Sequence, residues 1–195
     1  MTRFAPVSNG VDGWRQRQRA DTNTGFTNGF EGTRPRERMF DSLRARLYRI
    51  GFNLFPAYRR TGGRVTYVAP DWQEVRIKLP HTWRTRNYVG TTFGGSIYAA
   101  TDPFYMMMLL KNLGDEFTVW DKEADIRFKK PGQETLYARF TISDEELAAV
   151  RAELADSETD SIDRHYTVDL VDADGTVHAT VRKTVYVTTD RSKRV

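Results

Sequence analysis

Alternation of apolar and polar residues predicts a series of strands along this chain. In residues 74–79, Val75, Ile77 and Leu79 alternate with charged neighbours, which is typical of a strand with one wet and one dry face. The same period predicts strands over residues 64–69, 117–121, 124–129, 136–142, 165–171 and 177–188. The sequence Asp-Ala-Asp-Gly at 172–175 is a strong hairpin signal and joins the last two.

Three other segments have helical periodicity. From Met39, the side chains of Phe40, Leu43, Leu47 and Ile50 fall on one face, which predicts an amphipathic helix that ends near Gly51 and packs this face on the core. Residues 93 or 94 to about 113 are apolar nearly all round, so this helix should be enclosed. A capping box at 143–146 opens a short third helix that carries Leu147, Val150 and Leu154.

One buried helix followed by mostly antiparallel strands indicates an α+β fold in which a curved sheet wraps around the helix. We expect a single domain over residues 39–190, preceded by a flexible or loosely docked tail over 1–38 that lacks a sustained apolar period. Such a sheet has exposed edges and leaves the helix half covered, so pairing with a second copy, as a homodimer or homotetramer, is expected.

Composition narrows the class of protein. The net charge of +4 favours anionic partners in general, but Arg15, Arg17 and Arg19 alternate with glutamine rather than forming a basic block, which disfavours nucleic-acid binding through the tail. Residues 97–110 form the longest largely apolar run and contain Asp102 and Pro103, so no membrane span is expected. The first residues have no apolar segment typical of a secretory signal, and a cytoplasmic location is expected.

The residue types also limit the chemistry. The chain has no cysteine, and His81, His165 and His178 lack the spacing of metal ligands. No serine lies in a Gly-x-Ser-x-Gly context. We therefore expect no metal, no cofactor and no serine triad.

The most informative segment is residues 87–103, which places a glycine pair and a carboxylate at the two ends of an apolar helical segment. Gly94 and Gly95 would let a ligand approach free backbone N–H groups at a helix start, where a developing negative charge is favoured. Asp102 lies two turns further along, in apolar surroundings where an acid is costly without a partner or a function.

At these residues the chain resembles the hotdog-fold acyl-CoA thioesterase superfamily. Its phenylacetate-pathway-like branch carries an Asn, a His-Gly-Gly and an Asp nine positions after the His. Asn87, Gly94, Gly95 and Asp102 match, whereas Phe93 stands in place of the His. Phe-Gly-Gly followed by Asp-Pro is closer to an uncharacterised branch known only as a domain of unknown function. The resemblance spans about residues 39–190, and its specific motif is confined to 87–103.

The resemblance implies hydrolysis of an acyl-CoA or related thioester. Asp102 would act as base or nucleophile, Gly94 and Gly95 would bind the carbonyl oxygen, and Asn87 would support them. The acyl chain would be lined by Phe93, Tyr98, Phe104 and Met107. The coenzyme A phosphates would meet Arg84, Arg86, Lys129 and Lys130, with Arg182 and Lys183 as further candidates.

Each of these residues also has a structural interpretation. Asp102 and Pro103 match the N-cap and first position of a second helix, so the long segment is either kinked or divided there. The glycines could serve only packing, Asn87 could cap a turn, and Met106–Met108 could belong to the core. Lys183 shares strand parity with Val181 and Val185, which aims it at the dry face. A binding protein for acyl-CoA or a lipid-like ligand, without catalysis, is the alternative function.

Overall fold

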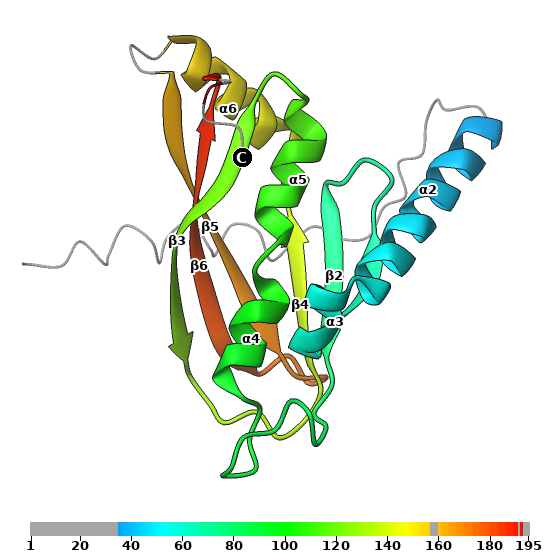
Figure 1. Cartoon of the computed structure of the whole chain (residues 1–195), viewed down its shortest axis with the longest axis vertical. Helices are drawn as coiled ribbons and strands as arrows, with labels where there is room; N and C mark the ends of the chain where they lie inside the picture. Colours follow the sequence, from blue (N-terminus) through cyan, green and yellow to red (C-terminus); the bar gives the residue numbers. More distant parts are fainter. Residues whose placement is uncertain (1–34, 157–159, 191, 193–195) are drawn as a thin grey trace, which may run out of the picture. The chain divides into compact units, whose positions relative to one another are not determined.

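The computed structural model describes residues 35–156, 160–190 and 192, and these form a six-stranded antiparallel sheet with five helices (Figure 1). The strand order is β1-β2-β4-β5-β6-β3. The strands are β1 (Arg64–Val68), β2 (Glu74–Leu79), β3 (Thr118–Phe128), β4 (Leu136–Thr141), β5 (Ser161–Val171) and β6 (Val177–Thr188). The predicted α+β arrangement of a curved sheet around central helices is confirmed.

The strands follow the alternation of the sequence, with two differences. In β2 and β4 every second residue is buried, as predicted. The two strands expected over 117–121 and 124–129 are a single strand, β3, because a shift of register between Asp121 and Glu123 lets the ladder with β6 continue past the interruption. Strand β5 begins at Ser161, four residues before the expected start, because its charged first half still pairs with β6.

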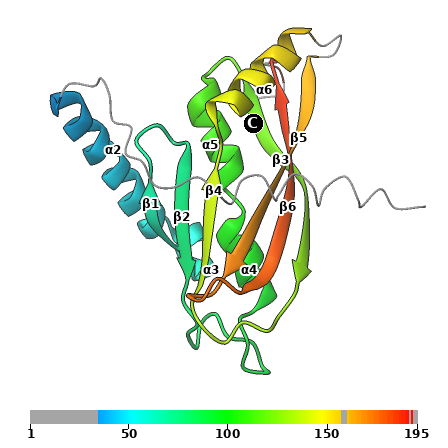
Figure 2. The same ribbon diagram turned by 180° about the vertical axis from the view of Figure 1, so that it is seen from behind.

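The central apolar segment consists of two helices, α4 (Gly94–Thr101) and α5 (Phe104–Leu113), rather than a continuous one. The division falls at Asp102 and Pro103, where the proline lacks an N–H and its ring interferes with the preceding turn. Figures 1 and 2 show both helices on one side of the sheet, which curves around them. Phe104, Met108 and Leu109 are fully buried there, and the Phe104 ring packs at a tilt against Phe140 of β4.

Helices α2 (Pro35–Leu54) and α3 (Pro56–Thr61) precede the sheet, and α6 (Asp144–Asp156) follows β4 as predicted. α2 begins at Pro35 and passes through Gly51, so both expected ends of this helix are wrong by a few residues. Asn53 fixes its C-terminal turn to β1, because its side chain both donates to the carbonyl of Val65 and accepts from the N–H of Val65. The predicted tail lies almost entirely in residues 1–34, outside the described residues.

The predicted packing face of α2 is wrong. Leu43, Leu47 and Ile50 are exposed, and the helix instead packs through Ala45 and Phe52. Ala45 is buried, and the Phe52 ring makes edge-on and tilted contacts with core aromatic rings. Helical periodicity identifies an apolar stripe, but it does not say which surface the stripe covers. In this chain the face of α2 that packs toward the sheet lies opposite the stripe and consists of an alanine and aromatic residues.

Candidate functional site

Asp102 lies where α4 ends, and its carboxylate does not cap the backbone donors at the start of α5. The N-terminus of α5 has no side-chain cap, so the carboxylate does not satisfy the donors of that helix. Instead, Lys183 of β6 donates from Nζ to Asp102 Oδ1 at 3.1 Å and also to the main-chain carbonyl of Asp102. The Asp102 side chain is 45% exposed, so it remains accessible from outside.

Lys183 is the buried centre of this cluster. Its side chain has no exposed surface, because β6 turns it toward the core together with Val181 and Val185, the parity read from the sequence. Besides Asp102, it donates to Asp121 Oδ2 at 2.6 Å. A buried ammonium is strongly disfavoured unless it is paired, and here two carboxylates compensate for its charge. This burial also places Lys183 away from the surface at which a substrate phosphate would bind.

Asp121 of β3 completes the cluster and was not anticipated as a site residue. Burial raises its pKa, Lys183 lowers it, and the nearby charge of Asp102 raises it further; the net direction is upward. Its second oxygen, Oδ1, is buried and has no hydrogen-bond partner among the described residues. The available signal was again strand parity, because Asp121 lies two residues after the buried Val119.

An apolar groove of about 920 Å³ opens beside Asp102. It is bounded by α2 and α3 on one side and by α4 and α5 on the other, and Asp102 is the acidic group among its described lining residues. Most of the lining is aromatic or aliphatic: Leu47, Tyr48, Phe52, Phe55, Ala57, Tyr58, Tyr98, Ala99, Pro103, Met106 and Met107. The structure therefore brings Asp102, Tyr98 and Met107 to one groove.

The other two residues expected at the acyl chain lie elsewhere. Phe104 is fully buried in the core, and Phe93 is half exposed at the start of α4. Tyr98 lies one turn before Asp102, and burial together with a hydrogen bond to Asp102 raises its pKa to about 12. Its hydroxyl therefore keeps its proton near neutral pH and is available as a donor beside the carboxylate.

Gly94 and Gly95 form the first turn of α4, as expected, and each accommodates an aromatic ring. A Cβ on Gly94 would lie 2.8 Å from the Phe128 ring, and one on Gly95 would lie 2.4 Å from the Phe93 ring. Phe93, at the N-cap, makes no side-chain cap. Among the described residues, no hydrogen-bond acceptor lies at the N–H of either glycine. These donors are thus available to a ligand.

The glycine amides and Asp102 do not meet within one chain. They lie at opposite ends of α4, separated by eight residues, which corresponds to about 12 Å along the helix axis. Asn87 is also apart, because its side chain closes a turn by donating to Thr91 Oγ1 at 2.8 Å and accepting from the Thr91 N–H at 2.9 Å.

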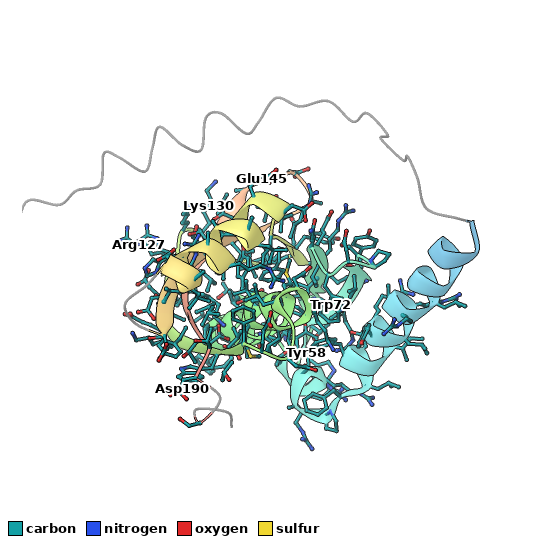
Figure 3. All side chains as sticks on the ribbon, turned by 90° about the horizontal axis from the view of Figure 1, so that it is seen from above. Tyr58, Trp72, Arg127, Lys130, Glu145 and Asp190 are labelled. Carbon is teal, nitrogen blue, oxygen red and sulfur yellow. The ribbon has the colours of Figure 1, made fainter. Side chains whose placement is uncertain are left out.

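The expected phosphate-binding side chains lie outside the groove. Arg84 stacks on the exposed Trp83, in a second cavity that is also lined by three other arginines, Arg59, Arg60 and Arg64. Arg86 is exposed, and its backbone forms an isolated antiparallel β-bridge with Thr92. Lys129 and Lys130 are exposed and donate their backbone N–H groups to His178. Figure 3 shows Lys130 on a different flank of the domain from Tyr58, which lines the groove.

The described part of the chain offers neither a metal centre nor a membrane-spanning helix. No group of three or more histidine, aspartate or glutamate side chains there could hold a metal ion. None of the helices in residues 35–156 and 160–190 has the length and apolar character that crossing a bilayer requires.

Comparisons with known proteins agree with this fold. A family described as a domain of unknown function (DUF4442) matches residues 44–187. A probable thioesterase of unknown function from Pseudomonas aeruginosa has a similar structure, with a TM-score of 0.65 and 19% identity over 73% of this chain and 94% of its own. Thioesterase superfamily member 2 from Mus musculus gives a TM-score of 0.53 and 14% identity over 73% of this chain and 96% of its own. No curated protein matches the sequence.

Proposed function

Because this chain belongs to the DUF4442 family and has the hotdog fold expected from residues 87–103, we propose that it hydrolyses an acyl-CoA or a related thioester in the cytoplasm. One observation carries the proposal. The Asp102 carboxylate lies at an apolar groove, partly open, and is held by the buried Lys183 rather than by its own helix break. Carboxylates in such surroundings are typical of sites that move protons or attack carbonyls.

The reaction would proceed through water activated by Asp102. The carboxylate takes a proton from a water molecule, whose oxygen forms a bond to the thioester carbonyl carbon. The tetrahedral intermediate collapses when the C–S bond breaks, and the thiolate accepts the proton from Asp102. Direct attack by Asp102 would give an acyl anhydride that water then opens. In either case Lys183 orients the carboxylate and supplies a compensating charge.

A second copy of the chain would complete the site. The developing negative charge on the carbonyl oxygen needs donors, and Gly94 and Gly95 are about 12 Å from Asp102 in the same chain. Two α4 helices packed antiparallel about a two-fold axis would bring Asp102 of each chain to the glycine amides of the other. Strand β3 lies at one edge of the sheet, so its free side could pair with the partner. The exposed rings of Phe93 and Phe128 lie beside Gly94 and Gly95, at the N-terminal end of α4.

The remaining predicted residues fit such a dimer as binding groups. Tyr98 and Met107 would contact the acyl chain in the groove. Arg84, Arg86, Lys129 and Lys130 lie away from the groove of their own chain, so they would meet the coenzyme A phosphates of a substrate held across the two-fold axis.

Thiol release from a panel of acyl-CoA substrates tests the proposal. Replacement of Asp102 by asparagine should lower kcat by at least about 100-fold, the usual contribution of a general base. Asp115→Asn is the matched control, because Asp115 is exposed and does not line the groove, and it should keep full activity. Wild-type turnover with an equally active D102N variant would overturn the mechanism. Light scattering would show whether the active species is a dimer.

Phe93 favours a second function, the binding of acyl-CoA or a lipid-like ligand without catalysis. A phenyl ring cannot polarise a carbonyl as the imidazole of the related branch could, and the groove would still hold an apolar chain. Saturable binding of acyl-CoA by the wild type, without release of thiol, would support this function over hydrolysis.

A further inference from the structure

Helix α2 presents a stripe of large apolar side chains to solvent. Leu43, Leu47, Ile50 and Leu54 are spaced by four, three and four residues, so they lie on one face of the helix, and each is between 44% and 67% exposed. Phe55 continues this surface and is 59% exposed. Figures 1 and 3 show α2 at the rim of the folded unit, with one flank away from the sheet. We call these five residues the α2 stripe.

Arginines flank the α2 stripe. Residues 43–70 contain six arginines and no aspartate or glutamate, the first acid being Asp71. At about 100° per residue, Arg44 and Arg46 lie on the two sides of the stripe. Arg59 and Arg60 lie on α3, just beyond Phe55. Among the described residues none of these four arginines forms an ion pair, so their charges are available to an external partner.

From this surface we infer that α2 docks on the face of an anionic lipid bilayer. An amphipathic helix with an apolar stripe and flanking arginines lies in the membrane interface, with its apolar side chains about 5–10 Å deep and its cations at the lipid phosphates. A second copy of the chain fits less well, because a contact between two stripes would place Arg44 and Arg46 of both chains at one interface, and residues 43–70 supply no acidic side chain to pair with them. Nucleic acid would pair with the arginines but leave the leucines in water.

The docked position has a consequence for the groove. Leu47 and Phe55 belong both to the α2 stripe and to the lining of the groove, so the groove opens next to the lipid-facing surface. An apolar ligand could therefore pass between the bilayer and the groove without crossing water. The docking of α2 does not depend on hydrolysis by Asp102, because the cluster is held by hydrogen bonds between Lys183, Asp102 and Asp121, none of which involves a stripe residue.

Flotation of the full chain with lipid vesicles tests the inference. The chain should float with vesicles of phosphatidylcholine containing phosphatidylglycerol and much less with phosphatidylcholine alone, and high salt should weaken the binding. Leu47→Gln with Leu54→Gln should weaken it by roughly tenfold for each leucine. Arg44→Gln with Arg46→Gln should cost about fivefold for each arginine on anionic vesicles.

Two control variants show whether vesicle binding depends on the α2 stripe or only on the total exposed apolar surface and net charge of the chain. Tyr88→Gln with Val89→Gln removes two exposed apolar side chains from the 87–91 turn. Lys78→Gln with Arg182→Gln removes the same net charge from exposed positions on the sheet. Both should bind vesicles like the wild type. Failure of the wild type to bind anionic vesicles, or equal losses in stripe and control variants, would overturn the inference. So would a stripe variant that changes the oligomeric state instead of vesicle binding.

Discussion

Replacement of Lys183 by methionine tests the central electrostatic feature of this fold. The change removes the ammonium that bridges Asp102 and Asp121 while keeping most of the apolar volume of the side chain. Lys183 itself is fully buried, so methionine should be accommodated without loss of packing. The effect on stability must therefore come from the two carboxylates that lose their cation.

The two carboxylates should respond differently. Asp102 is 45% exposed, so water can solvate its charge once Lys183 is gone. Asp121 is only 19% exposed, and one of its oxygens has no hydrogen-bond partner among the described residues. Removing one member of a buried pair typically costs about 3–5 kcal/mol, because the other charge is left uncompensated. We expect a loss of this size near neutral pH, arising mainly at Asp121.

Urea denaturation followed by tryptophan fluorescence would measure the loss, and second substitutions would locate it. Lys183→Met with Asp121→Asn should recover most of the lost stability, because no buried carboxylate remains unpaired. Lys183→Met with Asp102→Asn should recover little. At acid pH the single variant should be closer to the wild type, because Asp121 can then take up a proton. The reasoning would be refuted if Lys183→Met cost less than about 1 kcal/mol, or if Asp102→Asn rescued it as well as Asp121→Asn.

Two further predictions concern pH and backbone conformation. Burial raises the pKa of Asp121 above its ordinary value of 3.8, so the native state binds this proton more tightly than the unfolded chain does. The resulting stabilisation of the native state is complete below pH 3.8 and is lost as the pH rises through the raised pKa. Asp121→Asn should remove this loss of stability with rising pH, which is measured as the midpoint of thermal unfolding at a series of pH values from below 3.8 upward. Gly62 has φ 88°, and a Cβ there would lie 2.1 Å from Thr85 Cγ2, so Gly62→Ala should cost about 1–3 kcal/mol in urea denaturation. Gly51→Ala, within α2 and with no atom near the added Cβ, should not destabilise, and equal losses in both variants would contradict this account.

Much of the fold could be predicted because it follows from neighbouring residues. Alternation located the strands, and the resemblance in residues 87–103 led to the hotdog fold and the unknown-function family, both of which are confirmed. Strand parity also predicted that Lys183 lies on the buried face of β6, as it does in the structure. These features depend on side chains only a few positions apart, and local periodicity records them directly.

The packing of α2 was not accessible in this way. The sequence contains an apolar stripe at helical spacing, and packing on the core was the natural interpretation. In the structure Ala45 and Phe52 make that contact, and the stripe faces outward. The face that α2 turns toward the sheet depends on the hydrogen bonds between the Asn53 side chain and Val65 of β1, which are contacts between different elements.

By itself, the sequence determined which residues form strands and helices and that an acid follows a glycine pair in an apolar segment. Only the tertiary structure decided that the Asp102 carboxylate turns to Lys183, 81 positions away, and that Asp121 shares the same ammonium. The physical reason is that a buried charge must find its partners across the sheet. Strand order and the curvature of the sheet around α4 set those partners, and no local pattern encodes either property.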